Sequence, residues 1–304
     1  MDTKLKRIAE IAKSKPNEKV TSLMHLINKE MLLKCNEELK PNKASGIDGV
    51  SKIKYQESLE ENIEELLNKM KTFKYKPQAV KRVNIPKPGS NKTRPLGIPS
   101  YEDKLVQLGI NKILMSIYEQ DFIDCSFGFR PNRGCHDALK ILDVYLSKRN
   151  VNYIVDADIK GFFDNVSHEW IMKFLEHRIA DKNLLRYIGR FLKAGVMERG
   201  NFHKSYEGTP QGGIISPTLA NLYLHYALDM WFEKVVNKHC KGEAYLVRYC
   251  DDFVCCFEYE NEAKAFYKSL IERLAKFNLE VAQDKTSIIY FGKNAYFDWK
   301  LNKA

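Results

Sequence analysis

The sequence is poor in the features that mark membrane, secreted or zinc-binding proteins. Its longest apolar run, Phe253 to Phe257, is far too short to span a bilayer, and residues 1–15 lack the apolar core of a signal peptide. The seven cysteines are odd in number, include an adjacent pair and never form C-x-x-C. We therefore expect a cytoplasmic protein with reduced, mostly buried thiols, no membrane partner and no disulfide framework or zinc site.

Motifs of several common enzyme classes are also missing. No G-x-x-x-x-G-K-[ST] loop occurs, which disfavours an ATPase motor. The seven histidines are scattered and never take a metal-ligand spacing, so zinc chemistry and Ser-His-Asp hydrolysis receive little support. What remains is a chain of 304 residues, 44% hydrophobic and 29% charged, which is enough to pack a substantial core.

Positive charge gathers in the first third of the chain. The net charge is +10, and residues 1–100 account for +9 of it, with 21 basic and 12 acidic side chains. Residues 66–101 contain nine Lys or Arg and no Asp or Glu. A field of one sign attracts polyanions, although a solvated Lys-rich face gives the same pattern. A polyanionic partner is therefore a hypothesis to be tested against the rest of the sequence.

The spacing of apolar residues predicts an α+β chain. Helical spacing occurs at 20–32, 53–70, 102–119, 134–148, 167–193, 217–238 and 260–277, and strand-like patterns occur at 79–85, 94–98, 151–158, 244–249, 253–258 and 286–291. The segment 41–49 is expected to be an ordered turn, because it contains Pro, Asn and Gly. With 159–243 taken as one crossover, the last four strands give β-α-β-β-α-β.

That topology brings carboxylates together at one edge of the sheet. The first strand lies antiparallel beside the third, so its end at Asp158 meets the turn that carries Asp251 and Asp252. Asp156 shares a strand face with Asp158, and periodicity does not choose between them. An Asp-Asp pair alone is more often a plain hairpin turn. Converging acids with open positions suit two Mg²⁺ ions, the arrangement of polymerases and nucleases.

Six blocks of sequence, in order, resemble the reverse transcriptases encoded by group II introns, the intron maturase type. They are ASGIDGV at 44–50, IPKPGSNKTRPLGIP at 85–99, SFGFRPNRGCHDAL at 126–139, DADIKGFFDNVSHEWI at 156–171, GTPQGGIISPTLANLYL at 208–224 and RYCDDFV at 248–254. The likeness covers nearly the whole chain. It implies a right-hand polymerase with fingers and palm, the palm being an antiparallel β-α-β-β-α-β sheet with helices on one face.

The resemblance also assigns the catalytic site. The family pattern D-x-x-x-x-F-D selects Asp158 over Asp156, and the family's paired acids match Asp251 and Asp252. Two Mg²⁺ ions held by these three residues are implied. Cys250 stands where most relatives carry Ala, and because a small residue is kept we expect no loss of activity.

Further residues are expected to bind the incoming deoxynucleotide. A triphosphate needs Lys and Arg donors, and the family places such contacts on a hairpin that covers the nucleotide. Phe163 is expected to exclude a ribose 2′-hydroxyl, which disfavours an RNA-dependent RNA polymerase. The full set of nucleotide-binding residues that the resemblance implies is Lys81, Lys87, Arg94, Phe163, Gln211 and Lys285.

The implied partners are an RNA template, intron RNA, a DNA or RNA primer and deoxynucleoside triphosphates. The expected RNA-binding residues are Lys69, Lys71, Lys74, Lys76, Arg130 and Arg133. For the two arginines of the FGFRPNRG loop, contact with template backbone and organisation of the active-site wall both remain open. The second hypothesis for the whole chain is an RNA-binding splicing cofactor, or maturase, with the basic region as its docking surface.

The expected domains are fingers with an N-terminal extension at 1–120 and palm at 121–304, with a helical insertion that contacts the fingers at about 167–207. After the strand at 286–291 too few residues remain for a thumb, and no endonuclease module is seen. We therefore expect a thumb-less chain, either a fragment or a short member of the family. The palm face left open by the thumb is a candidate for homodimer formation.

Overall fold

The computed structural model describes residues 3–86, 89, 93–209, 212–292 and 295. The chain divides into two compact units: Met1–Asp121 with His168–Leu219, and Phe122–Ser167 with Ala220–Ala304. Both contain helices and a β-sheet, so the expected mixed α+β content is confirmed. None of the helices in the described residues combines the length and the apolar character needed to cross a membrane.

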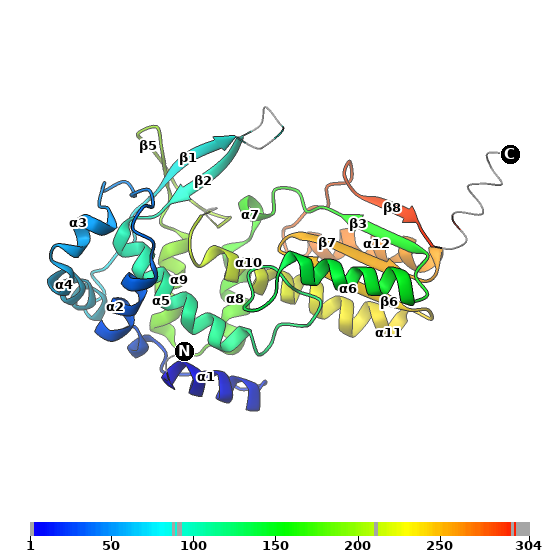
Figure 1. Ribbon diagram of the computed structural model, residues 1–304, viewed down its shortest axis with the longest axis horizontal. Helices are drawn as coiled ribbons and strands as arrows, with labels where there is room; N and C mark the ends of the chain where they lie inside the picture. The colour runs from blue at the N-terminus through cyan, green and yellow to red at the C-terminus, as the bar shows by residue number, and fades with distance from the viewer. Residues whose placement is uncertain (1–2, 87–88, 90–92, 210–211, 293–294, 296–304) are drawn as a thin grey trace. The chain divides into compact units, whose positions relative to one another are not determined.

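The first unit contains helices and a four-stranded sheet of order β2-β1-β4-β5, whose strands β1, β2 and β5 are labelled in Figure 1. Its strands are β1 (Val80–Pro86), β2 (Thr93–Ile98), β4 (Val196–Glu198) and β5 (Asn201–His203), and its helices are α1 (Thr3–Ser14), η1 (Met24–Leu26), α2 (Lys29–Glu38), α3 (Lys52–Gln56), α4 (Leu59–Lys71), α5 (Tyr101–Tyr118), α8 (His168–Arg178) and α9 (Lys182–Leu192). The β1–β2 hairpin was expected. Strand β4 then joins the edge of β1 in parallel.

The second unit holds a sheet of order β6-β7-β3-β8, in which every neighbouring pair is antiparallel. Its elements are α6 (Cys135–Lys148), β3 (Tyr153–Ala157), α7 (Phe162–Asn165), most of α10 (Ser216–Leu224), η2 (His225–Asp229), η3 (Phe232–Val236), α11 (Asn237–His239), β6 (Ala244–Tyr249), β7 (Asp252–Phe257), α12 (Glu260–Ala275) and β8 (Ser287–Tyr290). The helix expected over 217–238 is present as one succession of α- and π-helical turns.

The helix expected over 20–32 is wrong. Val20 instead pairs with Ile179 as a β-bridge, and the backbone N–H groups of Leu23 and Met24 donate to the Asp181 carboxylate. Helix α2 begins only at Lys29. The apolar residues of this segment pack into the core although the segment is irregular. Its long-range partners override the helical spacing and keep the backbone from forming a helix. The helix expected over 53–70 is likewise divided, into α3 and α4.

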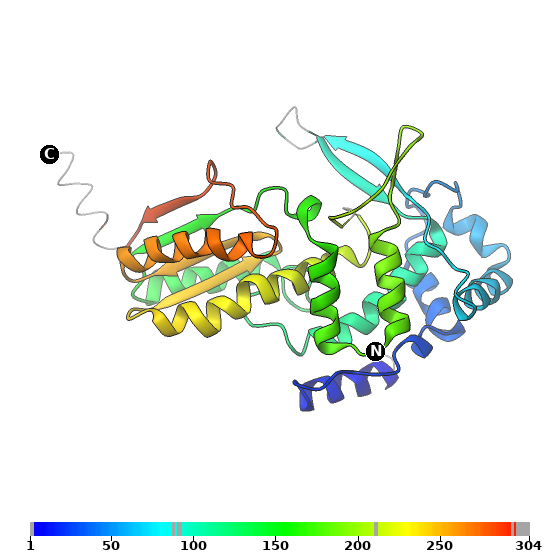
Figure 2. The ribbon, with the colours of Figure 1, turned by 180° about the vertical axis from the view of Figure 1, so that it is seen from behind.

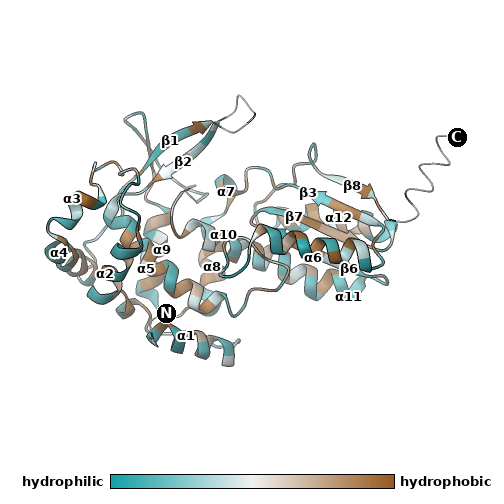
Figure 3. Ribbon diagram, in the orientation of Figure 1, coloured by the Kyte–Doolittle hydropathy of each residue, from teal (hydrophilic) through white to brown (hydrophobic). Residues whose placement is uncertain are grey.

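Helices cover both faces of the second sheet, so the expectation of helices on one face is wrong. On one face, the Phe257 ring of β7 packs against Phe266 of α12, with centroids 5.1 Å apart. On the other, Tyr245 of β6 stacks on Tyr145 of α6 at 4.1 Å. Figures 1 and 2 show α6 and α12 on opposite sides of the sheet. Helix α6 is amphipathic (Figure 3), and packing against the sheet removes its apolar side from water.

Candidate active site

The turn between β6 and β7 carries the paired acids. Tyr249 is opposite Asp252 in the β6–β7 register, so Cys250 and Asp251 form a two-residue turn. Cys250 has φ +62°, in the left-handed region, where a side chain costs roughly 1–2 kcal/mol. Such a conformation persists only where neighbouring groups hold it. The turn therefore depends on the residues packed around it.

Asp158 lies at the same end of the sheet. The β3–β7 register pairs Ala157 with Phe253, and one step further along both strands places Asp158 opposite Asp252. Directly opposed residues of an antiparallel pair have Cβ atoms about 4.5–5.5 Å apart on one face. Asp156 lies on that face too, opposite Val254, and is exposed, whereas Asp158 is half-buried. The structure thus puts Asp158, rather than Asp156, across from the acidic turn.

Lys285 contacts Asp158 from far along the chain. Its Nζ donates to Oδ2 of Asp158 at 2.7 Å, and the Ala282 N–H donates to the Asp158 carbonyl at 2.8 Å. This hydrogen bond and ion pair, together with the nearby Asp252, raise the pKa of Lys285. The side chain is exposed, so the pair adds little to stability. Its consequence is a protonated amine held beside the acids at neutral pH.

The oxygen-only donors at this edge suit a hard divalent cation. In the described residues, no three acidic, His or Cys side chains are gathered closely enough to form a metal-binding cluster. One carboxylate of the three candidates, Asp158, is bound instead to the Lys285 ammonium. This pair places positive charge against the Asp158 carboxylate at the sheet edge. The donor chemistry and the facing register of Asp158 and Asp252 therefore fit Mg²⁺.

A buried arginine holds the acidic turn in place. The Arg248 guanidinium is fully buried and forms a two-point ion pair with Asp229, at 2.7 and 2.6 Å. It also donates to the Cys250 carbonyl at 2.7 Å, to Asn221 Oδ1 at 3.0 Å and to Ser126 Oγ at 2.8 Å. Burial alone would lower the pKa of Arg248, but the pairing with Asp229 raises it. The Arg248 guanidinium therefore remains positively charged, and all of its N–H groups can donate hydrogen bonds to these partners.

The SFGFRP loop supports the same turn. A Cβ on Gly128 would lie 2.4 Å from the Cys250 sulfur, so only glycine fits there, and the Gly128 carbonyl accepts from Asn221 at 2.6 Å. Arg130 is 7% exposed, and its guanidinium donates to the carbonyls of Ile123 and Ser126 at 2.7 and 2.8 Å. Of the two roles left open for Arg130, these contacts favour the active-site wall.

Arg133, from the same loop, is more accessible. Its guanidinium pairs with the Asp124 carboxylate, donates to the Asp124 carbonyl at 3.1 Å and lies 5.5 Å from the centre of the Phe127 ring. About a quarter of its side chain is exposed. Contact with RNA therefore remains a prediction for Arg133.

The two phenylalanines after Asp158 have different surroundings. Phe162 is 2% exposed and packs edge-on against Tyr223, with centroids 6.3 Å apart. Phe163 is half-buried and meets the Phe162 ring at 5.3 Å and 72°. Gly161 precedes both with φ +53°, and this left-handed residue begins α7. Phe162 is thus a core residue, and Phe163 keeps an exposed part that a ligand can contact.

The first unit carries the basic hairpin. In the β1–β2 register Arg94 is opposite Ile85, four residues along β1 from Lys81, so Arg94 and Lys81 share one face and both are exposed. Arg82, on the other face, lies 3.6 Å from Glu198 of β4. Lys87 lies outside the described residues. The register therefore places Arg82, which is paired with Glu198, on one face of the hairpin. It places Lys81 and Arg94, two of the residues expected to bind the nucleotide, on the other face.

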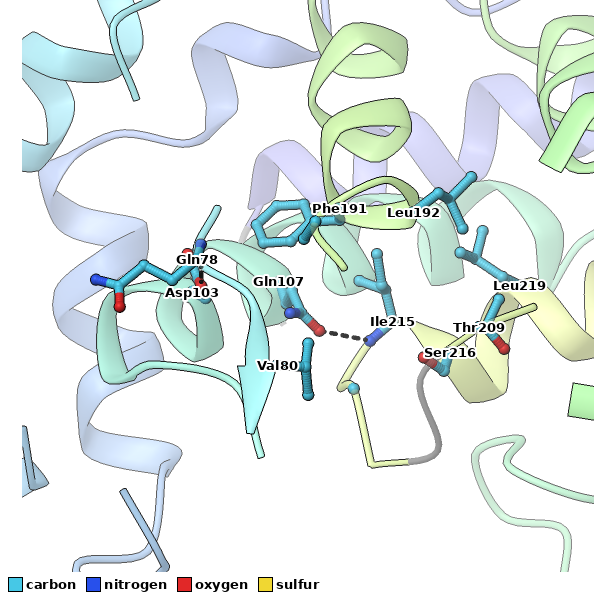
Figure 4. Close-up of a pocket in the computed structure, with 12 residues that line it drawn as sticks. Gln78, Val80, Asp103, Gln107, Phe191, Leu192, Thr209, Ile215, Ser216 and Leu219 are labelled. Carbon is cyan, nitrogen blue, oxygen red and sulfur yellow. Dashed lines mark hydrogen bonds between the residues drawn. The ribbon is translucent and has the colours of Figure 1, made fainter. Parts of the chain in front are cut away.

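The GTPQGG segment is anchored within the first unit by α5. Gln107 accepts from the Ile214 N–H at 2.8 Å. It also accepts from the Ile215 N–H at 3.5 Å, the bond drawn in Figure 4. A Cβ on Gly212 would lie 2.4 Å from the Gly97 carbonyl of β2, which explains the glycine. Gln211 lies outside the described residues. The small cavity beside Gln107, about 10 Å³, is of the size of one water molecule.

Among the four lysines expected to bind RNA, the structure separates one from the rest. Lys69 is paired with Glu65 at 2.9 Å on α4. Lys71, Lys74 and Lys76 are exposed, and no ion pair with them occurs in the described part of the chain. Acids from outside residues 66–101, such as Glu65, thus neutralise part of the basic run.

Sequence reasoning missed Arg248, Asp229, Asn221 and Gln107 as determinants of the site. Each is a polar residue at a buried position within an otherwise apolar pattern, and that mismatch is the signal that marks them. Their partners could not be read from the pattern, because they come from distant segments.

Comparison with known proteins identifies the family. Residues 85–300 match the reverse transcriptase (RNA-dependent DNA polymerase) family, which is more than half of the chain. The chain therefore belongs to the reverse transcriptase family, and the resemblance found in the sequence is confirmed.

The relatives are largely proteins of introns. The chain is 40% identical over 222 residues to the group II intron-encoded protein LtrA of Lactococcus lactis, covering 73% of this chain and 37% of LtrA. It is 33% identical over 227 residues to protein YkfC of Escherichia coli, covering 72% of this chain and 59% of YkfC. A putative COX1/OXI3 intron 1 protein of Saccharomyces cerevisiae is 36% identical over 182 residues, 60% of this chain and 21% of that protein. The chain thus spans less than two thirds of these relatives.

Proposed function

We propose that the protein is an RNA-directed DNA polymerase of a group II intron, which joins deoxynucleotides to a primer 3′-hydroxyl on an RNA template. The observation that carries this proposal is the register that sets Asp158 opposite Asp252 at the end of a two-residue acidic turn. Membership of the reverse transcriptase family supports it. The second unit is then the palm and the first unit the fingers.

Each residue of the site has a proposed part in the reaction. Asp158, Asp251 and Asp252 would hold Mg²⁺, which when bound lowers the pKa of the attacking hydroxyl and stabilises the departing pyrophosphate. Lys285, a protonated amine at neutral pH that donates to Asp158, holds a proton for that leaving group. Arg248 fixes the turn through the Cys250 carbonyl.

Other residues are proposed to bind the substrates rather than to react. The cations of the hairpin, Lys81, Lys87 and Arg94, bind the triphosphate, and Gln211 binds near the sugar. Lys71, Lys74, Lys76 and Arg133 contact RNA phosphates. The expectation of mostly buried thiols is wrong, because only three of the seven free cysteines, Cys35, Cys255 and Cys256, are buried. The absence of disulfides among them supports the proposal of a reducing, cytoplasmic location.

The direct test is primer extension. With Mg²⁺ and deoxynucleotides, the protein is expected to lengthen a DNA primer annealed to an RNA template. If no extension is seen at any Mg²⁺ concentration while RNA is still bound, the polymerase proposal fails. The second candidate, a maturase that only binds intron RNA, would then stand, and it is favoured by the exposed lysines beyond α4 and by relatives named as intron proteins.

Phe163 is expected to set the preference for deoxynucleotides. Replacing it in Phe163→Val opens space at its exposed edge, so the rate ratio of ribonucleotide to deoxynucleotide incorporation should rise at least about tenfold, or ~1.4 kcal/mol. The measurement is single-nucleotide extension with each substrate. Phe162→Leu is the matched control. It removes side-chain volume from the core beside Phe163, so it should lower the stability of the protein without changing the incorporation ratio. An unaltered ratio in Phe163→Val would exclude the gate.

A further inference from the structure

Helix α9 carries a row of cations along one side. Lys182, Arg186, Arg190 and Lys193 are spaced by four, four and three residues, so they follow one face of the helix in steps of about 5–6 Å. The opposite face is apolar, with Leu184, Ile188 and Phe191 buried. In the described residues no carboxylate pairs with any of the four cations. The row is therefore an unneutralised basic ridge.

A hollow of about 560 Å³ lies beside this ridge, entirely within the first unit. Its charged lining is Lys76, Arg186, Arg190 and Lys193, and its floor is apolar, with Met172 and Leu185 among others. No acidic residue lines it. His168 is the other titratable group there, and its pKa lies below the usual value because burial and the nearby Lys193 lower it by more than its bond to the Gly208 carbonyl and the nearby Glu207 raise it. The hollow is thus cationic without any contribution from His168 at neutral pH.

The segment that presents Lys76 to the ridge is held firmly. Arg190 donates to the carbonyls of Phe73 and Tyr75 at 3.0 and 2.6 Å. The Tyr75 hydroxyl donates to the buried Asp103, and the Gln78 N–H donates to the same carboxylate at 2.9 Å. Lys76 is therefore fixed between two anchored neighbours, more than a hundred residues in sequence from the ridge that it joins.

An exposed aromatic ring completes the surface. Phe73 is 36% exposed, and the Arg186 guanidinium lies 4.4 Å from its ring centre. A guanidinium close to an aromatic ring has N–H groups that can bind phosphate, and the exposed part of the ring offers a face on which a base can stack. The lining of the hollow contains no Asn, Gln, Ser or Thr, so it offers no side chains of the kind that read adenine edges.

We propose that this surface, formed by Lys76, Arg186, Lys193 and Phe73, binds the phosphate backbone of an RNA strand without sequence preference. The inference deepens the proposed function, on which it rests for the choice of RNA as the polyanion. It adds α9 to the basic region seen in the sequence. Within that region it separates Lys76, which lines the hollow, from Lys69, which is paired with Glu65.

The test compares Arg186→Gln/Lys193→Gln with a matched control, Lys173→Gln/Lys264→Gln. The control also removes two exposed cations, but both are paired with acids four residues away. Arg190 is left in place because it holds the backbone. The measurement is fluorescence anisotropy of a labelled unstructured RNA at increasing salt. Each lost phosphate contact should lower the slope of log affinity against log salt by ~0.7 and the affinity about five-fold at roughly 0.1 M salt, so the test pair should lose ~25-fold.

Three outcomes are informative. Equal loss in the test and control variants would mean that general charge, not this surface, binds RNA, and would overturn the inference. A test variant that keeps full affinity would overturn it as well. If the wild-type protein shows no primer extension but the test variant alone loses RNA affinity, the surface stands and the polymerase proposal fails.

Discussion

Replacing both turn acids, in Asp251→Asn/Asp252→Asn, is expected to reduce primer extension at least about 1000-fold, equivalent to ~4 kcal/mol of transition-state stabilisation. The amides keep the size of the carboxylates but lose the negative charge that holds a divalent cation. Both side chains lie at the turn, so folding should be nearly unaffected. The measurement is the single-turnover extension rate on an RNA template, with RNA affinity determined in parallel. Affinity should stay within about two-fold, because the acids oppose phosphate rather than bind it.

The structure supplies a matched control for this prediction. Asp156 and Asp158 lie on one face of β3, two residues apart, but only Asp158 comes opposite Asp252. The extension rate of Asp158→Asn should therefore be reduced about as much as that of the double variant. The extension rate of Asp156→Asn should stay within about three-fold of the wild-type rate. Equal losses in the two single variants would show that general surface charge, and not a defined site, determines the rate. Full activity in the double variant would refute the mechanism.

Breaking the buried ion pair beneath the turn should give the largest loss of stability. In Asp229→Leu the Arg248 guanidinium stays buried at 0% exposure without its partner. Removing one member of such a pair costs about 3–5 kcal/mol. Urea denaturation followed by circular dichroism should show this as a lower transition midpoint with an unchanged slope. A loss below about 1 kcal/mol would mean that water or another group reaches Arg248.

The double variant Asp229→Leu/Arg248→Met separates stability from positioning. Replacing both charged residues by apolar ones of similar size is often neutral for stability, so the urea midpoint should return close to the wild-type value. The Cys250 carbonyl and Asn221 would still lack their donor. We therefore expect the extension rate to stay at least about tenfold low, corresponding to ~1.4 kcal/mol. Recovery of both properties would show that Arg248 serves stability alone.

Elements with a strong local pattern could be predicted from the sequence. Helices α5 and α6 and the β6–β7 hairpin lie within about two residues of their expected limits, because their apolar spacing and turn residues agree with their tertiary contacts. The segment 20–32 could not be predicted. Its N–H groups bond to Asp181, 158 residues away from Leu23, and such a partner leaves no trace in local periodicity.

The candidate site shows the same division. The position of the acids at one edge of the sheet could be predicted, because β3 and β6 end at the same edge, and the family motif then selected Asp158. Their catalytic role stays a prediction. The support beneath them could not be found, since Arg248 occupies a strand position that the pattern gives no reason to pair with a helix residue such as Asp229. Lys87 and Gln211 stay predictions. So do Lys81 and Arg94, although the register places those two on one face.

The Arg248 contacts have a consequence for the order in which the second unit folds. The guanidinium joins the loop at Ser126, the helical segment at Asn221 and Asp229, and the turn at Cys250, so its ring of bonds closes only after chain segments up to 122 residues apart have met. A β6–β7 hairpin formed early would lack these bonds, and Cys250 would be free to leave its left-handed conformation. We therefore expect the turn that carries the acids to reach its native conformation late in folding.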